Sequence, residues 1–269
     1  MSIDYKAIAE LEFKNFQEKY HGDYDTKYAI YTMGIPASGK SSSVGYILKK
    51  LGIPKQSIIL LDPDDIMSRI EGYSNTLSSS NKTKFNRASI IITSKILDNL
   101  IENNMSFVYF GTGRSYQSYS RNMRKTSKHD FINILVNVEL ELEEAIRRNS
   151  KRKRSLGRNI IANINSTLKH PIKEGKPDTR LDLYQKLCDI VFQVNTNINP
   201  PKINLVKKKD GLLSALNTTN SNNSINSNNS SSTRKRSIKS TENYSQRSNK
   251  SNKKKSFNKT VKRASNYNN

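Results

Sequence analysis

The segment from residue 28 to residue 51 constrains the fold most, because an apolar strand, a glycine-containing loop and a helix follow one another there. The loop, GIPASGKS, has the pattern G-x-x-x-x-G-K-S from Gly34 to Ser41. Its glycines allow backbone N–H groups to approach a polyphosphate, and the helix N-terminus adds positive dipole. The side chain of Lys40 can reach the β- and γ-phosphates. This context predicts a phosphate-binding loop. The alternative, a plain turn between strand and helix, explains neither the lysine nor the serine.

A nucleoside triphosphate bound at such a loop needs Mg²⁺, so we expect ATP and Mg²⁺ as cofactors, with the Ser41 hydroxyl as the metal ligand. The residues expected to contact the nucleotide are those of the loop and of the first helical turn. They are Gly34, Ile35, Pro36, Ala37, Ser38, Gly39, Lys40, Ser41 and Ser42.

Apolar runs alternate with helical periodicity along the first 210 residues. Strands are predicted at 28–33, 57–62, 106–110, 131–138 and 190–194, and an extended piece at 203–206 completes the sheet. Helices are predicted at 4–20, 83–103, 117–126, 141–154 and 178–188, the last with Asp178 as N-cap. Such alternation implies right-handed crossovers and a parallel sheet covered on both faces. We expect an α/β fold of the P-loop NTPase, nucleoside-kinase-like type, with about five parallel strands.

The composition changes sharply after residue 216, which divides the chain into an expected kinase-like domain, 1–216, and a tail, 217–269. The tail has almost no aliphatic residues and no periodicity, so we expect it to be disordered. From Asn220 it holds twelve Lys and Arg and one acidic residue, Glu242, and therefore carries +11 of the total +23. This charge predicts salt-sensitive attraction to nucleic acid, an anionic membrane or another polyanion, without base specificity. The alternative is a solvated tail that keeps the protein in solution.

The cellular compartment is indicated by what the sequence lacks. Cys188 is the single cysteine, which excludes an internal disulfide and fits a reducing compartment. No apolar run reaches membrane-spanning length, and the first residues lack the layout of a signal peptide. We expect an intracellular, cytoplasmic protein; the basic runs at 234–236 and 253–255 also fit nuclear import, although such runs are common. The three histidines lie too far apart in the sequence to predict a metal triad.

Acidic residues follow the second predicted strand in the sequence Asp62-Pro63-Asp64-Asp65. A carboxylate at this position can take a proton from a substrate hydroxyl or hold waters around Mg²⁺. We choose Asp64 for this role. Alternatively, Asp64 or Asp65 is the N-cap of the helix that begins near Ile66. The two interpretations are compatible.

The loop after the third predicted strand, GTGR, carries Thr112 and Arg114. Ligands of open parallel sheets bind at the carboxyl ends of the strands, which places this loop on the same rim as the glycine-containing loop. A hydroxyl and a guanidinium there suit an anionic substrate. Alternatively, Thr112 caps the next helix and Arg114 is a surface charge.

A basic segment, RRNSKRKRSLGR, ends the fourth predicted helix. In P-loop kinases a mobile basic lid can close over the polyphosphate and stabilise charge in the transition state. A run this long contains mostly solvated side chains, so we expect one or two of them to act in catalysis. The arginines of the segment are Arg147, Arg148, Arg152, Arg154 and Arg158.

Taken in order, GIPASGKS, LLDPDDI, FGTGR and the basic helix ending in GR resemble the zeta-toxin-like P-loop kinases. Many of these carry G-x-P-x-S-G-K-[ST], then D-x-D or N-P-D, then E-G-T-x-R. The resemblance covers about residues 27–210. The resemblance implies that Lys40 and Ser41 bind ATP and Mg²⁺ and that Asp64 accepts the proton. It also implies that Thr112 and Arg114 bind the substrate. Two lid arginines would then be Arg148 and Arg158.

One position departs from the family pattern, since Phe110 stands where the family commonly has Glu. Toxins of the family phosphorylate UDP-N-acetylglucosamine, but Phe110 leaves the substrate of this chain open. The leading hypothesis is transfer of the γ-phosphate of ATP to a hydroxyl of a small anionic substrate, such as a nucleotide sugar. The alternatives are a polynucleotide or nucleotide kinase, and a nucleic-acid-binding protein with a vestigial ATP site.

Overall fold

The computed structural model describes residues 3–22, 26–74, 76–152, 154–172 and 177–210. All of these belong to the first of two compact units, 1–226 and 227–269. The boundary expected at 216 and the tail expected from 217 onward lie outside the described residues and stay predictions. Within the described ranges, no helix combines the length and apolar character needed to cross a bilayer.

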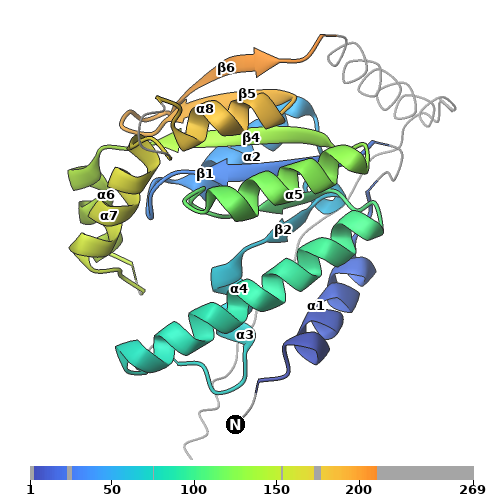
Figure 1. Cartoon of the computed structure of the whole chain (residues 1–269), viewed down its shortest axis with the longest axis vertical. Coiled ribbons are helices and arrows are strands. Elements are labelled where there is room, and N and C mark those ends of the chain that lie inside the picture. Colours follow the sequence, from blue (N-terminus) through green and yellow to red (C-terminus); the bar gives the residue numbers. More distant parts are fainter. Residues whose placement is uncertain (1–2, 23–25, 75, 153, 173–176, 211–269) are drawn as a thin grey trace, which may run out of the picture. The chain divides into compact units, whose positions relative to one another are not determined.

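Six strands form one mixed sheet in the order β2-β3-β1-β4-β5-β6 (Figure 1). Strands β1 to β5 pair in parallel, which confirms the expected α/β sheet. β6 pairs with β5 in the antiparallel sense, because the six residues between them are too few for a crossover. The strands are β1 (Tyr28–Met33), β2 (Ile59–Leu61), β3 (Phe107–Tyr109), β4 (Ile132–Glu139), β5 (Ile190–Asn195) and β6 (Lys202–Lys208).

Eight α-helices and one 3-10 turn lie within the described ranges. The second strand, predicted at 57–62, is shorter in the structure, because Ser57 is the last residue of η1 and β2 covers only Ile59–Leu61. The helical elements are α1 (Tyr5–Lys19), α2 (Lys40–Leu51), η1 (Lys55–Ser57), α3 (Pro63–Arg69), α4 (Ser79–Glu102), α5 (Tyr116–Lys128), α6 (Leu142–Ser150), α7 (Arg158–Lys169) and α8 (Arg180–Leu187).

Two helix predictions are wrong in detail. The helix expected over 141–154 ends at Ser150, and a second helix, α7, follows it. The chain turns between them because the amide of Asn149 bonds both backbone groups of Leu156, at 2.8 and 3.2 Å. The N-cap of α8 is Thr179, not Asp178, because Thr179 forms a reciprocal capping box with Asp182.

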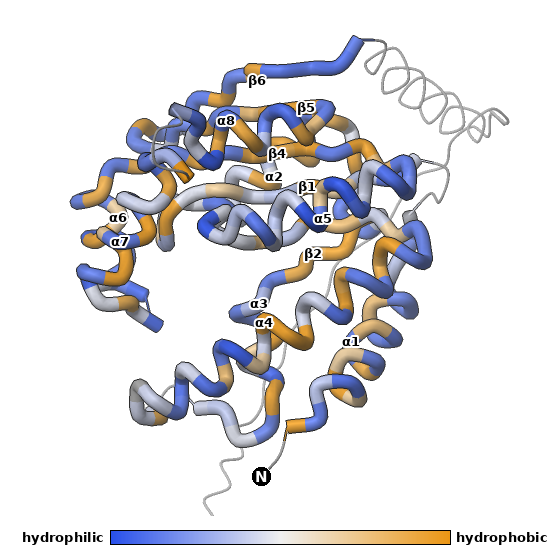
Figure 2. The backbone as a smooth tube through the Cα atoms, viewed as in Figure 1, coloured by the Kyte–Doolittle hydropathy of each residue, from blue (hydrophilic) through white to orange (hydrophobic). Residues whose placement is uncertain are grey.

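The two faces of the sheet bury separate apolar clusters. Alternate residues of β1 show this directly, since Tyr31 faces α4, α5 and α8 whereas Ile30 faces α2. α1 packs on α4, and both helices alternate hydrophobic and hydrophilic residues along their length (Figure 2). This is the pattern of helices that bury one side. A third cluster joins α6 and α7 beside the glycine-containing loop through Ile35, Ala145 and Ile161.

A fully buried polar side chain fixes β4 against α5. The Asn133 amide donates to Met123 O (2.9 Å) and Ser127 Oγ (2.8 Å), and its oxygen accepts from Thr126 Oγ1 (2.6 Å). Its backbone N–H donates to a carboxylate oxygen of Asp189, which precedes β5. One asparagine therefore holds the starts of two strands and the end of a helix in register.

We expect Asn133→Ala to lower the free energy of unfolding by about 2–3 kcal/mol, because the change leaves buried hydrogen-bonding groups without partners. Urea denaturation measures the loss. Asn86→Ala on the exposed side of α4 is the matched control and should change stability by less than about 0.5 kcal/mol. Equal effects of the two substitutions would contradict the role given to Asn133.

Candidate functional site

The loop between β1 and α2 is shaped by two glycines. Gly34 has a φ of 144°, and a Cβ at this position would lie 2.5 Å from the Val138 carbonyl oxygen. Gly39, the N-cap of α2, has a φ of 86°. Ala37 also takes a positive φ, 62°, which is strained for a residue with a side chain. The loop therefore passes against the end of β4 in a conformation that other sequences would resist, as a phosphate-binding loop requires.

Lys40 lies inside this loop. Its ammonium donates to the carbonyl oxygens of Gly34 (3.0 Å) and Ile35 (2.9 Å). Burial lowers the pKa of Lys40 to about 8; nearby Asp62 opposes the shift and Arg152 adds to it. A cation held in a partly desolvated loop is stabilised by any polyanion that enters, so this lysine favours a phosphate ligand.

Hydrogen bonds from the residue after β5 and from α6 hold the loop in place. Thr196, directly after β5, donates its hydroxyl to the Ser38 carbonyl at 2.9 Å. Arg148 of α6 donates to the Thr196 carbonyl at 2.8 Å and to the Glu144 carboxylate at 2.7 Å. Ser38 Oγ is buried without a hydrogen-bond partner among the described atoms. Sequence reasoning missed Thr196, although a threonine at the carboxyl end of a predicted strand was a usable signal.

The acidic segment follows β2 at the same edge of the sheet. Asp62, not Asp64 or Asp65, is the N-cap of α3, because its carboxylate accepts the Asp64 N–H at 2.9 Å and Pro63 fills the first helical position. Partial burial raises the pKa of Asp62 to about 6. Asp64 is half exposed, and its carboxylate forms a 2.6 Å ion pair with Arg154.

The GTGR loop is tied to the end of β1. Thr32 exchanges two 3.0 Å hydrogen bonds with Gly111, and the Gly34 N–H donates to the Thr112 carbonyl at 3.2 Å. Thr112 does not cap the following helix, since the N-cap of α5 is Ser115. Its hydroxyl instead accepts the Arg114 N–H at 3.4 Å. The Arg114 side chain is exposed, so both groups expected to bind substrate lie at the rim.

The basic segment contributes unequally to the site. Arg154 reaches Asp64, and Arg152 lies close enough to Lys40 to influence its pKa. Arg148 contacts the loop only through Thr196. Arg158 pairs with Glu143, and both side chains are well exposed. The structure thus brings Arg152 and Arg154 to the rim, where the sequence pointed to Arg148 and Arg158.

Phe110 does not line the rim. It is 9% exposed and belongs to the apolar cluster beneath α2 that contains Val44 and Ile47. The position that the family pattern gives to a carboxylate is therefore part of the core here.

The residues of the loop fit a nucleoside triphosphate. The loop combines two glycines of positive φ, a buried Ser38 hydroxyl without a partner among the described atoms, and a buried ammonium. Ser41 and Ser42 are exposed in the first turn of α2. Among the described residues, no group of three or more His, Cys, Asp or Glu side chains is placed to hold a metal ion.

A family model described as Zeta toxin matches residues 13–210. The chain belongs to the zeta toxin family. A comparison with curated protein sequences gives no match. Family membership accounts for the order of the loop, the acidic segment and the GTGR loop along the sheet, and it supports an ATP-dependent, kinase-like protein.

Solved structures share the fold of this zeta toxin family member. One comes from the PezAT chromosomal toxin–antitoxin system of Streptococcus pneumoniae, with a TM-score of 0.56, 10% identity, and coverage of 84% of this chain and 98% of that chain. Another is AvrRxo1-ORF1:-ORF2 with ATP, with a TM-score of 0.53 and 12% identity. That match covers 74% of this chain and 65% of that one, so the chain spans less than two thirds of its length.

We expect Asp62→Asn to raise the free energy of unfolding at pH 7 by about 1–3 kcal/mol. The pKa of Asp62 is higher in the folded protein, about 6, than its ordinary 3.8, so the folded state prefers the protonated carboxyl. Stability therefore falls as the pH rises from about 4 to about 6 and stays lower above that range. Asparagine keeps the N-cap without this cost.

Urea denaturation between pH 4 and pH 7 measures this effect, and the gain should vanish near pH 4. Asp65→Asn, on the exposed side of the same helix, is the matched control and should show no such pH-dependent gain. A variant that is less stable than the parent at pH 7 would refute the argument.

Proposed function

We propose that this chain is an ATP-dependent phosphotransferase that moves the γ-phosphate of ATP to a hydroxyl of a small anionic substrate, such as a nucleotide sugar. One observation carries the proposal. The phosphate loop after β1, the carboxylates after β2 and the polar loop after β3 lie on three neighbouring strand ends at one edge of the sheet. A phosphate donor and a hydroxyl acceptor can meet only where such groups converge.

The phosphate loop takes the donor. Backbone N–H groups of Ala37, Gly39 and Lys40 at the N-terminus of α2 bind the phosphates, and the Lys40 side chain exchanges its two carbonyl partners for phosphate oxygens. Ser41 and Ser42 are exposed in the first turn of this helix. Bound Mg²⁺, with Ser41 as its protein ligand, would offset negative charge on the β- and γ-phosphates. The neighbouring structure with ATP supports this choice of nucleotide.

The acidic segment and the GTGR loop take the acceptor. We assign the base to Asp64, because its carboxylate is accessible at the rim whereas that of Asp62 is engaged as a helix cap. Asp64 must part from Arg154 before it can accept a proton. Arg114 would hold an anionic group of the acceptor, with Thr112 donating to a neighbouring oxygen.

The basic segment provides the lid. Arg148 is fixed behind the loop by Glu144, whose pKa is lowered to about 2 mainly by its bonds to Arg147 and Arg148. Arg158 is exposed in the first turn of α7 and would have to leave Glu143 to approach the phosphates. Arg154 already contacts Asp64 at the rim, from where it would approach the transferred phosphate. We propose that Arg148 positions the loop and that Arg158 and Arg154 act from the lid.

We expect Lys40→Ala to abolish phosphotransfer, because it removes the cation that binds the phosphates. Asp64→Asn should lower the rate by about 10²–10⁴-fold, because it removes the general base. The assay is transfer of label from γ-labelled ATP with Mg²⁺. Asp65→Asn removes the same charge one residue away and should keep activity within a few-fold. Equal activity of the Asp64 and Asp65 variants, or transfer by the Lys40 variant, would refute the mechanism.

The acceptor is identified by the same assay with a substrate panel of nucleotide sugars, free sugars and a 5′-hydroxyl oligonucleotide. Transfer to a nucleotide sugar that weakens in Arg114→Gln, mainly through KM, supports the proposed substrate class. Transfer to the oligonucleotide alone would replace it with a polynucleotide kinase.

A further inference from the structure

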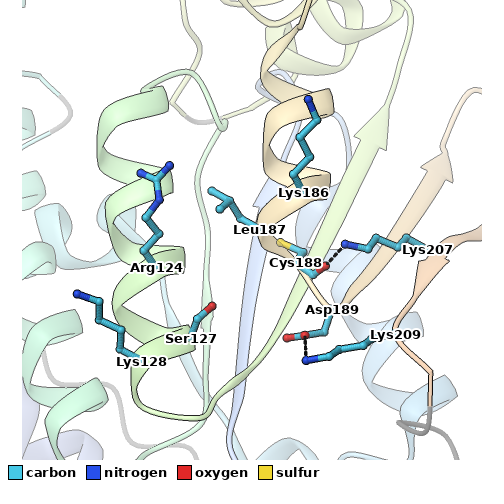
Figure 3. A pocket seen from close by; sticks show the side chains of 9 residues that line it. All are labelled: Arg124, Ser127, Lys128, Lys186, Leu187, Cys188, Asp189, Lys207 and Lys209. Carbon is cyan, nitrogen blue, oxygen red and sulfur yellow. Dashed lines mark hydrogen bonds and ion pairs between the residues drawn. The ribbon is translucent and has the colours of Figure 1, made fainter.

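The GTGR loop is held by α8 as well as by β1. α5 and α8 lie side by side on one face of the sheet (Figure 1). Their C-terminal ends flank a cavity at the edge where β4 and β5 begin (Figure 3). Their N-terminal ends lie at the other edge, where the GTGR loop leads into α5. The start of α8 is therefore in reach of the loop that is proposed to bind the acceptor.

Two side chains of α8 donate to successive carbonyl groups of this loop. The Tyr184 hydroxyl donates to the Gly113 carbonyl at 2.8 Å, and Arg180 Nε donates to the Arg114 carbonyl at 2.7 Å. Residues four positions apart lie on the same side of a helix, so both donors come from one face of α8. Tyr184 is fully buried, and its ring stacks on that of Tyr116 at the start of α5. The loop backbone is thus fixed at two consecutive residues.

Arg180 also bonds a second element of the structure. Its Nη1 donates to the Thr167 carbonyl in the last turn of α7. In a continuing helix that carbonyl would accept the N–H of the residue four positions later, but Pro171 has no N–H to give. One guanidinium therefore connects the GTGR loop to α7, the helix that begins with Arg158.

The local chemistry of α8 does not explain an arginine at this position. A cation in the first turn of a helix is disfavoured by the helix dipole. The helix start is already capped by the reciprocal bonds of Thr179 and Asp182, and these bonds lower the pKa of the Asp182 carboxyl. Within the described residues Arg180 forms no ion pair, and its partners are two neutral carbonyls. The contacts outside α8 are what this side chain provides.

We propose that Arg180 is a positioning residue for the acceptor. It holds the Arg114 backbone against the end of α7 and thereby sets where the exposed Arg114 guanidinium meets an anionic group of the substrate. This role rests on the proposed function, in which Arg114 binds the acceptor. Arg180 acts through the loop and does not touch the acceptor itself. Neither of its bonds reaches the phosphate loop, so ATP binding is independent of it.

Four versions of the full chain test this role: the parent, Arg180→Gln, Arg180→Lys and the control Arg121→Gln. Arg121 is an exposed arginine of α5, so the control loses the same charge from the helix that follows the loop. Initial rates of transfer from γ-labelled ATP are measured with Mg²⁺ and with UDP-N-acetylglucosamine as the nucleotide-sugar probe, and each substrate is varied in turn. Urea denaturation checks that each variant is folded.

We expect Arg180→Gln to raise KM for the nucleotide sugar by about 10–10²-fold, because the guanidinium that binds it is displaced. KM for ATP should stay at the parent value. Arg180→Lys should be impaired to a similar degree, because one ammonium lacks the planar fork that reaches both carbonyls. The Arg121 control should match the parent for both substrates.

Hydrogen exchange read by mass spectrometry tests the same contacts without any reaction. In Arg180→Gln, the backbone amides of the GTGR loop and of the last turn of α7 should both exchange faster than in the parent, whereas those of the phosphate loop should not. A parent that transfers no phosphate to the probe would overturn the nucleotide-sugar proposal. Exchange alone would then determine whether Arg180 connects the two segments.

The positioning role is overturned by unchanged exchange in the loop and α7, or by an unchanged KM for the nucleotide sugar when the parent is active. It is also overturned if KM rises equally for both substrates, since that indicates a general loss of structure. Full activity in Arg180→Lys would show that charge suffices without the bridge. If Arg180→Gln does not fold, Arg180→Lys serves for the same comparisons of KM and exchange.

Discussion

The close approach of Gly34 to the Val138 carbonyl is the contact on which the site depends. A side chain at residue 34 would fill the space between the end of β1 and the end of β4, and the loop would have to move away from the sheet. With glycine there, the loop stays near enough for Thr196 to bond Ser38 and for Gly34 to bond the Thr112 carbonyl. The loops after three strands are thereby fixed by one side-chain and one backbone hydrogen bond, which cost little entropy once the sheet has formed. Side chains at the rim therefore need to extend only a short distance to contact a ligand there.

Charge is distributed over the molecule in two ways. At the loop, a buried ammonium and a partly buried carboxyl both have pKa values shifted towards the neutral form, which means that burying these charges costs electrostatic free energy. A ligand that neutralises Lys40 recovers part of that energy. Where β4 and β5 begin, by contrast, the side chains of Arg124, Lys128, Lys186 and Lys209 are exposed to solvent. Only the arrangement at the loop combines charge with a fixed shape.

The sequence was sufficient for features that depend on local chemistry. The loop, the strands and the parallel sheet follow from a motif and from apolar runs, and both are properties of neighbouring residues. The sequence was insufficient where a side chain bonds residues several positions away. The break between α6 and α7 is made by Asn149 bonding Leu156, and a basic helical pattern gave no sign of it. The sequence also could not predict which residue pairs with Asp64, because the basic segment offers five arginines and only packing brings Arg154 to this carboxylate.

The burial of Phe110 bears on how this chain relates to the rest of its family. Its ring helps to seat α2, the helix that carries the phosphate loop, on the sheet. Introducing a carboxylate there would place a charge among Val44, Ile47 and Ile30 and would disturb the seating of the loop itself. The family's glutamate therefore cannot be grafted onto this backbone as a single exchange. The position of the family's glutamate thus serves the phosphate loop in this chain, through the packing of the helix that carries the loop.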